Sequence, residues 1–133
     1  MPDSAKPRTA ITPPGAQPPP VPLSPGIRRG GIVQVAGQIA NDPATGALVG
    51  DTVAEQTRAC LRNVLAVLDA AGATEQDIVM LRVYLTDVAH FAEMNTAYAE
   101  LLSRPYPART TVYVGLPPGL LVEIDALAVT ESA

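Results

Sequence analysis

Arg109 is the residue of this 133-residue chain best suited to hold a small carboxylate. It lies in the run Pro-Ala-Arg-Thr-Thr at residues 107–111, where Pro105 and Pro107 stiffen the approach to a predicted strand. The guanidinium is planar and permanently charged, so it can donate two parallel hydrogen bonds to one carboxylate. The spacing alone favours a plainer interpretation, an arginine in a surface ion pair. Features elsewhere in the chain favour carboxylate binding by Arg109 over a surface ion pair.

Two carboxylates lie in the last apolar stretch, which we predict to be a strand over residues 121–130. Glu123 and Asp125 alternate with apolar residues that should pack on the helices, so both carboxylates lie on the opposite face. On such a strand a carboxylate must be paired, solvated in a cleft or used in chemistry. Arg82 lies on the same kind of face in a strand predicted over residues 78–86 and is a candidate partner. A structural ion pair at an oligomer interface competes here with a catalytic role.

The composition excludes several classes of function. The length suits one domain, and the net charge of −4 argues against binding to nucleic acid, which needs a basic patch. No apolar run approaches the roughly 20 residues of a membrane span, so we expect no membrane partner. The single cysteine, Cys60, excludes an internal disulfide and fits a reducing compartment, so we expect a cytoplasmic protein. With one cysteine and one histidine, no transition-metal site is expected.

The first 25 residues differ from the rest of the chain, because they hold nine of its fourteen prolines. Such a stretch buries little and cannot donate a full ladder of hydrogen bonds, which is typical of polyproline II or disorder. We therefore predict a flexible N-terminal tail over residues 1–25 and a single domain over residues 26–133.

The domain begins with a predicted hairpin, strands over residues 27–29 and 32–39 joined by a Gly-Gly turn. Gly37 inside the second strand indicates a bulge or a close backbone approach. A capping box at residues 52–55 begins a helix that ends at Gly72, and Asp87 caps a second helix over residues 88–102. Asn95 is the polar exception on the apolar stripe of that helix and needs a partner if it is buried.

Three further strands, over residues 78–86, 110–114 and 121–130, complete the predicted sheet. In the first of them we expect Val79, Leu81, Val83 and Leu85 to face the helices, and Ile78, Met80, Arg82, Tyr84 and Thr86 to face away. The element order predicts an α+β fold of two layers, with both helices on one face of the sheet. The second face is partly apolar, which favours a symmetric oligomer that closes over it.

Segments along nearly the whole chain resemble the Rid family, the reactive intermediate deaminases, also called the YjgF family. The similarity covers roughly residues 21–130, and its motifs follow one another in the family's order. They are Ala-Gly-Gln-Ile at 36–39, the turn at 42–46, Glu-Gln-Thr at 55–57, the stretches at 69–73, 83–87 and 91–95, Pro-Ala-Arg-Thr at 107–110, and Val-Glu-Ile-Asp-Ala at 122–126.

The resemblance implies a chorismate-mutase-like protomer, with one mixed sheet and two helices on one face, assembled as a homotrimer with clefts at the subunit interfaces. It implies hydrolysis of reactive 2-imino acids, such as 2-iminobutanoate and 2-iminopropanoate, to 2-keto acids and ammonia. These imines are products of pyridoxal-phosphate enzymes, so the implied role is detoxification. It implies no metal and no organic cofactor.

The resemblance also assigns roles to individual residues. Arg109 matches the family's carboxylate-binding arginine, and Glu123 matches the acid that positions or activates the attacking water. Gly37 matches the residue whose backbone N–H meets the ligand, and Thr111 matches a strand position that lines the cleft. We add Asn95 to these as a candidate for substrate binding.

Leu23 departs from the family, which usually has a tyrosine at this position. A leucine cannot donate a hydrogen bond to water or substrate, although carboxylate binding by Arg109 is unaffected. Three hypotheses follow: an imine deaminase, a non-catalytic regulatory trimer that binds small carboxylates, and a related hydrolase or lyase of a larger substrate.

Overall fold

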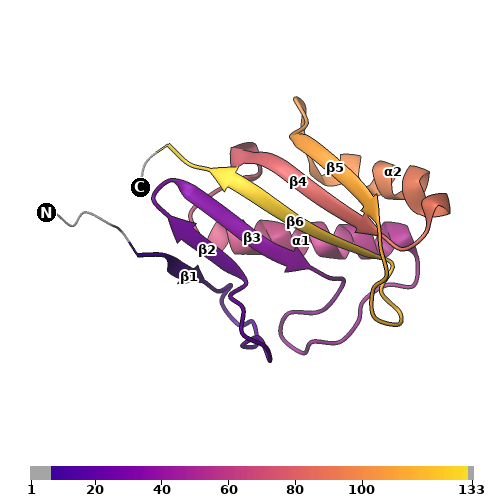
Figure 1. Ribbon diagram of the computed structural model, residues 1–133, viewed down its shortest axis with the longest axis horizontal. Helices are drawn as coiled ribbons and strands as arrows, with labels where there is room; N and C mark the ends of the chain where they lie inside the picture. The colour runs from indigo at the N-terminus through magenta and orange to yellow at the C-terminus, as the bar shows by residue number, and fades with distance from the viewer. Residues whose placement is uncertain (1–6, 132–133) are drawn as a thin grey trace, which may run out of the picture.

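A six-stranded mixed sheet forms one layer of the protein, and two helices form the other (Figure 1). The computed structural model describes residues 7–131. The strand order is β1-β2-β3-β6-β4-β5, and all neighbours are antiparallel except β4 and β5. The strands are β1 Thr9–Ile11, β2 Gly26–Arg29, β3 Ile32–Gln38, β4 Ile78–Leu85, β5 Ala108–Tyr113 and β6 Val122–Val129. The predicted two-layer α+β fold is confirmed.

The helices begin at the caps that the sequence indicates. α1 spans Val53–Ala70, and its capping box forms as predicted, with the Thr52 hydroxyl accepting the N–H of Glu55 at 3.1 Å. α2 spans Phe91–Leu101 and follows a short 3₁₀ turn, η2 Val88–His90, which Asp87 caps. A second 3₁₀ turn, η1 Glu75–Asp77, precedes β4. Between residues 7 and 131, neither helix has the length and apolar character needed to cross a bilayer.

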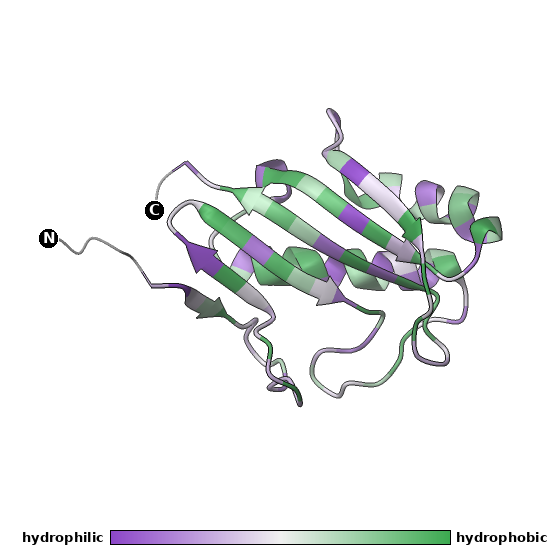
Figure 2. Ribbon diagram, in the orientation of Figure 1, coloured by the Kyte–Doolittle hydropathy of each residue, from purple (hydrophilic) through white to green (hydrophobic). Residues whose placement is uncertain are grey.

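The core lies between the sheet and α1, where apolar side chains alternate along the strands as period two requires (Figure 2). On β6 the residues predicted to face the helices are all fully buried: Val122, Ile124, Ala126 and Ala128. Because alternate residues of this strand are buried, Glu123 and Asp125 project from the opposite face of the sheet. We call that opposite side the open face.

The start of β4 departs from the predicted alternation. Ile78 is buried and Val79 is 47% exposed, which reverses the expectation for these two residues. The cause is a shift in the register of β4 against β6 between Ile78 and Met80. The extra residue on β4 moves the side chains before it to the opposite faces of the sheet. From Leu81 onward the predicted faces are correct.

The proline-rich segment corrects a second expectation, that of a flexible tail. Thr9, Ala10 and Ile11 form β1 and pair with β2, and Ile11 packs against the core. Pairing is possible because the prolines flank these three residues rather than interrupt them. Residues 13–25 then run along the sheet's end and form one wall of a cavity. Residues 1–6 of the expected tail lie outside the described residues.

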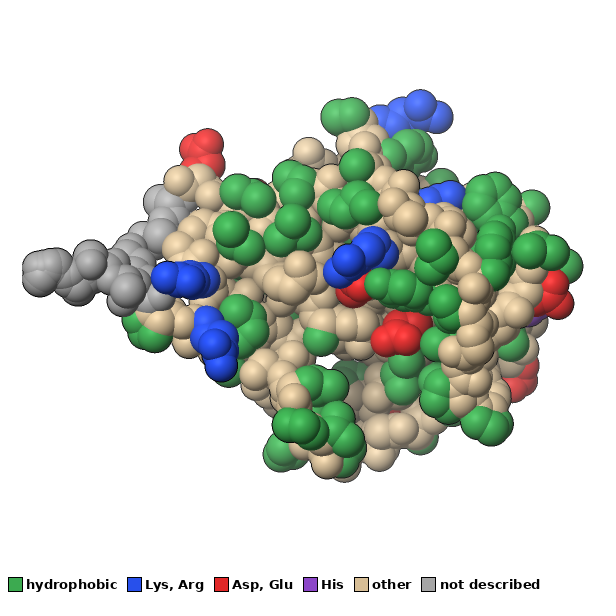
Figure 3. Space-filling model, viewed as in Figure 1, with side chains coloured by type: hydrophobic (Ala, Val, Ile, Leu, Met, Phe, Trp, Pro, Cys, Tyr) green, Lys and Arg blue, Asp and Glu red, His purple; other side chains and the backbone are tan. Residues whose placement is uncertain are grey.

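Exposed apolar side chains gather on the open face of the sheet, which faces the viewer in Figure 3. Ile32, Val79 and Val129 on the strands are each about half exposed, at 53%, 47% and 46%. Contiguous apolar surface of this kind is typical of an interaction surface.

Candidate functional site

Glu123 on β6 lies directly against the backbone of Gly37 on β3. The ladder between these strands shifts register between Val35 and Gln38, so Gly37 lies in an irregularity of the sheet. A Cβ added to Gly37 would collide with Oε2 of Glu123, so only glycine leaves room for this carboxylate. The predicted bulge or close approach at Gly37 is therefore confirmed, and Glu123 is the group that approaches.

The surroundings of Glu123 favour its protonated form. Partial burial raises the pKa of the Glu123 carboxyl above its usual value, and the negative charge of Asp125, two residues along the same face, raises it further. A carboxyl with a raised pKa exchanges protons more readily near neutral pH than an exposed glutamate does.

Asp125 is held by two donors from β4. Arg82 Nε donates to Oδ1 at 2.8 Å, and the Tyr84 hydroxyl donates to Oδ2 at 2.7 Å. The pairing of Arg82 with a carboxylate of β6 is thus confirmed, and Asp125 is the partner. Tyr84 lies opposite Glu123 in the ladder between β4 and β6, so its side chain flanks that carboxylate on the open face.

Arg109 lies in a different setting, beside α2. Its guanidinium stacks on the ring of Tyr98 at 4.8 Å and lies 5.7 Å from the centre of the Phe91 ring. Within residues 7–131 Arg109 forms no ion pair, so the surface-pair interpretation is not what the structure shows. The two rings hold the guanidinium in place beside α2.

The pocket around Arg109 has a volume of about 300 Å³. Asn95 Oδ1 in this pocket is buried and has no hydrogen-bond partner in the described part of the chain, whereas the Tyr98 hydroxyl interacts with the Arg109 guanidinium. Buried polar atoms normally have partners, so this pocket awaits groups from a ligand or from another copy of the chain. Thr111, two residues beyond Arg109, lies on the same side of β5 and is half-buried.

Arg109 and Glu123 belong to opposite faces of the sheet. Arg109 pairs in register with Leu81, whose side chain is fully buried beneath the helices. Glu123 instead pairs with Tyr84, on the open face. One copy of the chain therefore holds the candidate residues in two separate groups, which we call half-sites: Glu123 with Gly37, and Arg109 with Asn95, with Thr111 further along β5.

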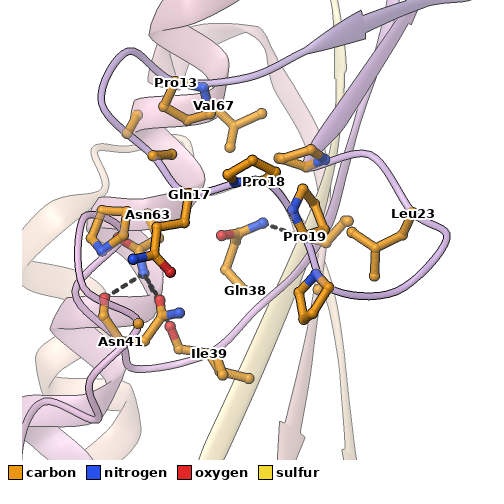
Figure 4. Close-up of a pocket in the computed structure, with 18 of the residues that line it drawn as sticks. Pro13, Gln17, Pro18, Pro19, Leu23, Gln38, Ile39, Asn41, Asn63 and Val67 are labelled. Atoms are coloured by element: carbon orange, nitrogen blue, oxygen red, sulfur yellow. Dashed lines mark hydrogen bonds between the residues drawn. The ribbon is translucent and has the colours of Figure 1, made fainter.

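Leu23 lies at a cavity of about 400 Å³ next to the first half-site (Figure 4). The proline-rich segment at residues 13–25, the end of β3, the loop after it and α1 form its walls, and we call it the proline-walled cavity. Leu23 is 51% exposed, and it lines the cavity together with Ala36 and Gly37. The sequence did not indicate this cavity, because its proline wall was expected to be a loose tail.

Cys60 lies near the Glu123 half-site but on the helix side of β6, where its Sγ donates to the backbone carbonyl of Val122 at 3.5 Å. Cys60 is fully buried on α1, and burial raises the pKa of its thiol to about 12, so it remains an inert apolar side chain as expected. Across residues 7–131, no group of three or more His, Cys, Asp and Glu side chains is placed to hold a metal ion. Tyr98, expected only as core, is the residue of the Arg109 pocket that the sequence did not indicate.

Comparison with known proteins places these features in a family. A family model described as Endoribonuclease L-PSP matches residues 15–130. A RutC family protein of Pyrococcus horikoshii is 43% identical over 111 residues, which cover 83% of this chain and 88% of the relative.

Solved structures agree with the sequence matches. The crystal structure of RidA from an Antarctic Psychrobacter species superposes with a TM-score of 0.85 at 33% identity, covering 92% of this chain and 99% of that one. The structure of Escherichia coli TdcF with bound serine superposes with a TM-score of 0.84 at 34% identity, with the same coverage.

Proposed function

The chain belongs to the Rid (YjgF/RutC) family, and from that premise we propose that it hydrolyses reactive 2-imino acids to 2-keto acids and ammonia. The observation that carries this proposal is the carboxylate of Glu123, which has a raised pKa and lies against the backbone of Gly37 beside a cavity. Imines such as 2-iminobutanoate and 2-iminopropanoate are already reactive, so one anchor and one acid suffice for useful acceleration.

In this proposal the site is shared between two copies of the chain in a homotrimer. Arg109 and Glu123 lie on opposite faces of one sheet, so a cleft between copies is needed to combine them. The exposed apolar side chains of the open face support such an assembly, because contact with a second copy removes them from water. The homotrimer acts in the cytoplasm, where it removes imines released by pyridoxal-phosphate enzymes.

Arg109 anchors the substrate through its carboxylate. The guanidinium donates two hydrogen bonds to that group, while its stacking on Tyr98 keeps the plane fixed. Asn95 Oδ1 supplies an acceptor that still needs a donor, and Thr111 follows Arg109 on the same side of β5 as a further candidate contact. The serine bound to Escherichia coli TdcF carries the same α-carboxylate, which supports an anchor of this kind.

Glu123 transfers the proton that the hydrolysis requires. Its carboxylate accepts a proton from water as the water oxygen bonds to the imine carbon, and the C=N electron pair moves to nitrogen. When the imine nitrogen enters protonated, this step gives a neutral carbinolamine, and Glu123 returns its proton to the amine nitrogen. The C–N bond then breaks and ammonia leaves, while the hydroxyl oxygen forms the keto group and passes its proton back to Glu123. The Gly37 backbone lies beside the carboxylate and is placed to contact the reacting centre.

Leu23 supports a second candidate function. Its side chain lies at the Glu123 half-site and can neither donate nor accept a hydrogen bond, whereas the family's usual tyrosine can do both. A homotrimer that keeps Arg109 but lacks this hydroxyl could bind small carboxylates without hydrolysing imines. Activity against an imine separates the two candidates.

A trapping assay tests the proposal. A pyridoxal-phosphate dehydratase generates 2-iminobutanoate, semicarbazide traps it, and the protein competes with the trap. We expect wild type to reduce trapping, Arg109→Ala to restore it, and the matched control Arg62→Ala, on the exposed side of α1, to behave as wild type. Activity only in Leu23→Tyr would support the non-catalytic function, and no activity in any variant would refute the deaminase.

A further inference from the structure

We propose that the proline-walled cavity is the side-chain subsite of this site and makes the protein selective for 2-imino acids with large, uncharged side chains. The inference rests on the proposed function, since it names the substrate class of the same site. It depends on the cavity's position, its size and the chemistry of its lining.

The proline-walled cavity adjoins Gly37, where the proposed reaction takes place beside Glu123. Gly37 lines the cavity and also contacts the Glu123 carboxylate, so the two spaces share one stretch of backbone. Ala36 and Leu23 line the cavity beside Gly37. A substrate whose imine carbon lies at Gly37 can therefore extend its side chain past Leu23 into the cavity.

The size of the cavity exceeds what the smallest imino acids need. Its volume of about 400 Å³ lies within the usual range of small-molecule pockets, roughly 300–1,000 Å³. A methyl or ethyl side chain is comparable with one or two waters of about 30 Å³ each and would leave most of the space unfilled. A side chain of four or more heavy atoms fills more of it and removes more apolar surface from water.

The lining of the cavity is uncharged. Six prolines line it, with Val21, Leu23, Ile39 and Val67 among the other apolar residues, and no charged side chain takes part. A charged side chain entering this space would lose its hydration without gaining a charged partner, which is unfavourable. The lining therefore favours aliphatic or thioether side chains over carboxylates and amines.

The polar groups of the cavity are largely satisfied by the protein. Asn63 Nδ2 donates to the backbone carbonyls of Ile39 and Asn41, both at 3.0 Å. Gln38 lies inside the cavity in Figure 4, and its Nε2 donates to the carbonyl of Ala36 at 2.9 Å. Within residues 7–131, neither Gln38 Oε1 nor the side-chain amide of Gln17, which also lines the cavity, takes part in a hydrogen bond, so a few polar groups are available within a mainly apolar space.

The test compares imino acids of different side chains. An amino-acid oxidase with catalase generates the imines of leucine, methionine, alanine and glutamate, and semicarbazide trapping reports their hydrolysis. We expect kcat/KM for the leucine and methionine imines to exceed that for the alanine imine by tenfold or more, the size that extra buried methylenes supply. The glutamate imine should gain nothing over the alanine imine.

A pair of alanines on α1 provides a variant and its control. Ala66 lines the cavity, whereas Ala70 lies on the exposed end of the same helix and does not. Ala66→Phe should fill the cavity and lower the ratio of kcat/KM for the leucine imine to that for the alanine imine by tenfold or more. Ala70→Phe should leave this ratio unchanged.

The outcomes separate the subsite from the proposed function. Hydrolysis of the alanine imine at least as efficiently as the leucine imine, with no effect of Ala66→Phe on the ratio, would overturn the subsite and leave the deaminase intact. If no imine is hydrolysed, calorimetry with 4-methyl-2-oxopentanoate and 2-oxopropanoate decides. Tighter binding of the larger keto acid, lost in Ala66→Phe, would support the subsite, and equal or absent binding would overturn it.

Discussion

The two faces of the sheet are built for different purposes, and β6 shows the contrast within neighbouring residues. On the helix side Ile124 is fully buried in a closed core. On the open face Glu123 has a carboxyl of raised pKa, next to an ion pair and exposed apolar side chains. The helix face buries a closed core against α1, whereas the open face leaves apolar side chains exposed. Stability and function should therefore respond separately to substitutions at adjacent positions.

The largest effect is expected from Glu123→Gln. Loss of the group proposed to transfer the proton should lower kcat by about 100-fold or more, the usual contribution of general acid–base catalysis. KM should change much less, because Arg109 still holds the carboxylate. Initial rates in the trapping assay measure both constants. Asp69→Asn, an exposed site at the end of α1, is the control, and an equal loss of kcat there would contradict the assignment.

The adjacent substitution Ile124→Ala should act on stability instead. Removing most of a fully buried side chain leaves a cavity, and the free energy of unfolding should fall by about 3 kcal/mol. Urea unfolding at one fixed protein concentration gives this value, since an oligomer's stability depends on concentration. Val88→Ala, at a position 67% exposed, should cost less than about 0.5 kcal/mol. Comparable losses at both sites would mean that the helix face is not the main source of stability.

A smaller effect, on pH dependence, is expected from Asp125→Asn. The charge of Asp125 raises the pKa of Glu123, and Glu123 must be ionised to accept a proton from water, so activity falls as the pH drops through that pKa. Asparagine keeps an acceptor for Arg82 and places an amide N–H that can donate to the Tyr84 oxygen, while the charge is removed. The acid limb of the kcat profile should move to lower pH. A limb that stays in place would show that Asp125 does not act on Glu123.

The raised pKa of Glu123 also gives a stability effect with a definite sign. The folded chain binds this proton more tightly than the unfolded chain, so its contribution to stability is lost as pH rises from about 4.5 through the raised pKa. Glu123→Gln should remove this loss, and the variant should be at least as stable as wild type at pH 7. Urea unfolding at pH 4.5 and pH 7 measures the difference, and a variant less stable than wild type at pH 7 would refute it.

The parts predicted well from sequence are those that depend on local rules. The capping box at Thr52, the alternation along β6 and the close approach at Gly37 each follow from a few neighbouring residues, and the structure confirms them. Resemblance to the Rid family supplied the family and the candidate site residues. The placement of Arg109 and Glu123 on opposite faces of the sheet depends on strand pairing and is not a local property.

The parts predicted poorly depend on long-range pairing. The faces of Ile78 and Val79 are reversed by a register shift against a strand more than forty residues away, which nothing near residue 78 indicates. β1 forms because β2 offers it an edge, although the surrounding prolines suggested an unpaired tail. The sequence did not indicate the proline-walled cavity, because its wall forms only when residues 13–25 pack beside the end of β3 and α1.

The most direct test of a site shared between copies mixes two inactive variants. Arg109→Ala and Glu123→Gln chains are unfolded together in equal amounts, refolded and compared with each variant refolded alone. Random assembly should place an intact Arg109 beside an intact Glu123 in about one quarter of the clefts of a cyclic homotrimer, restoring about one quarter of wild-type activity. Activity that stays at the level of the separate variants would show that these two residues do not act together across copies.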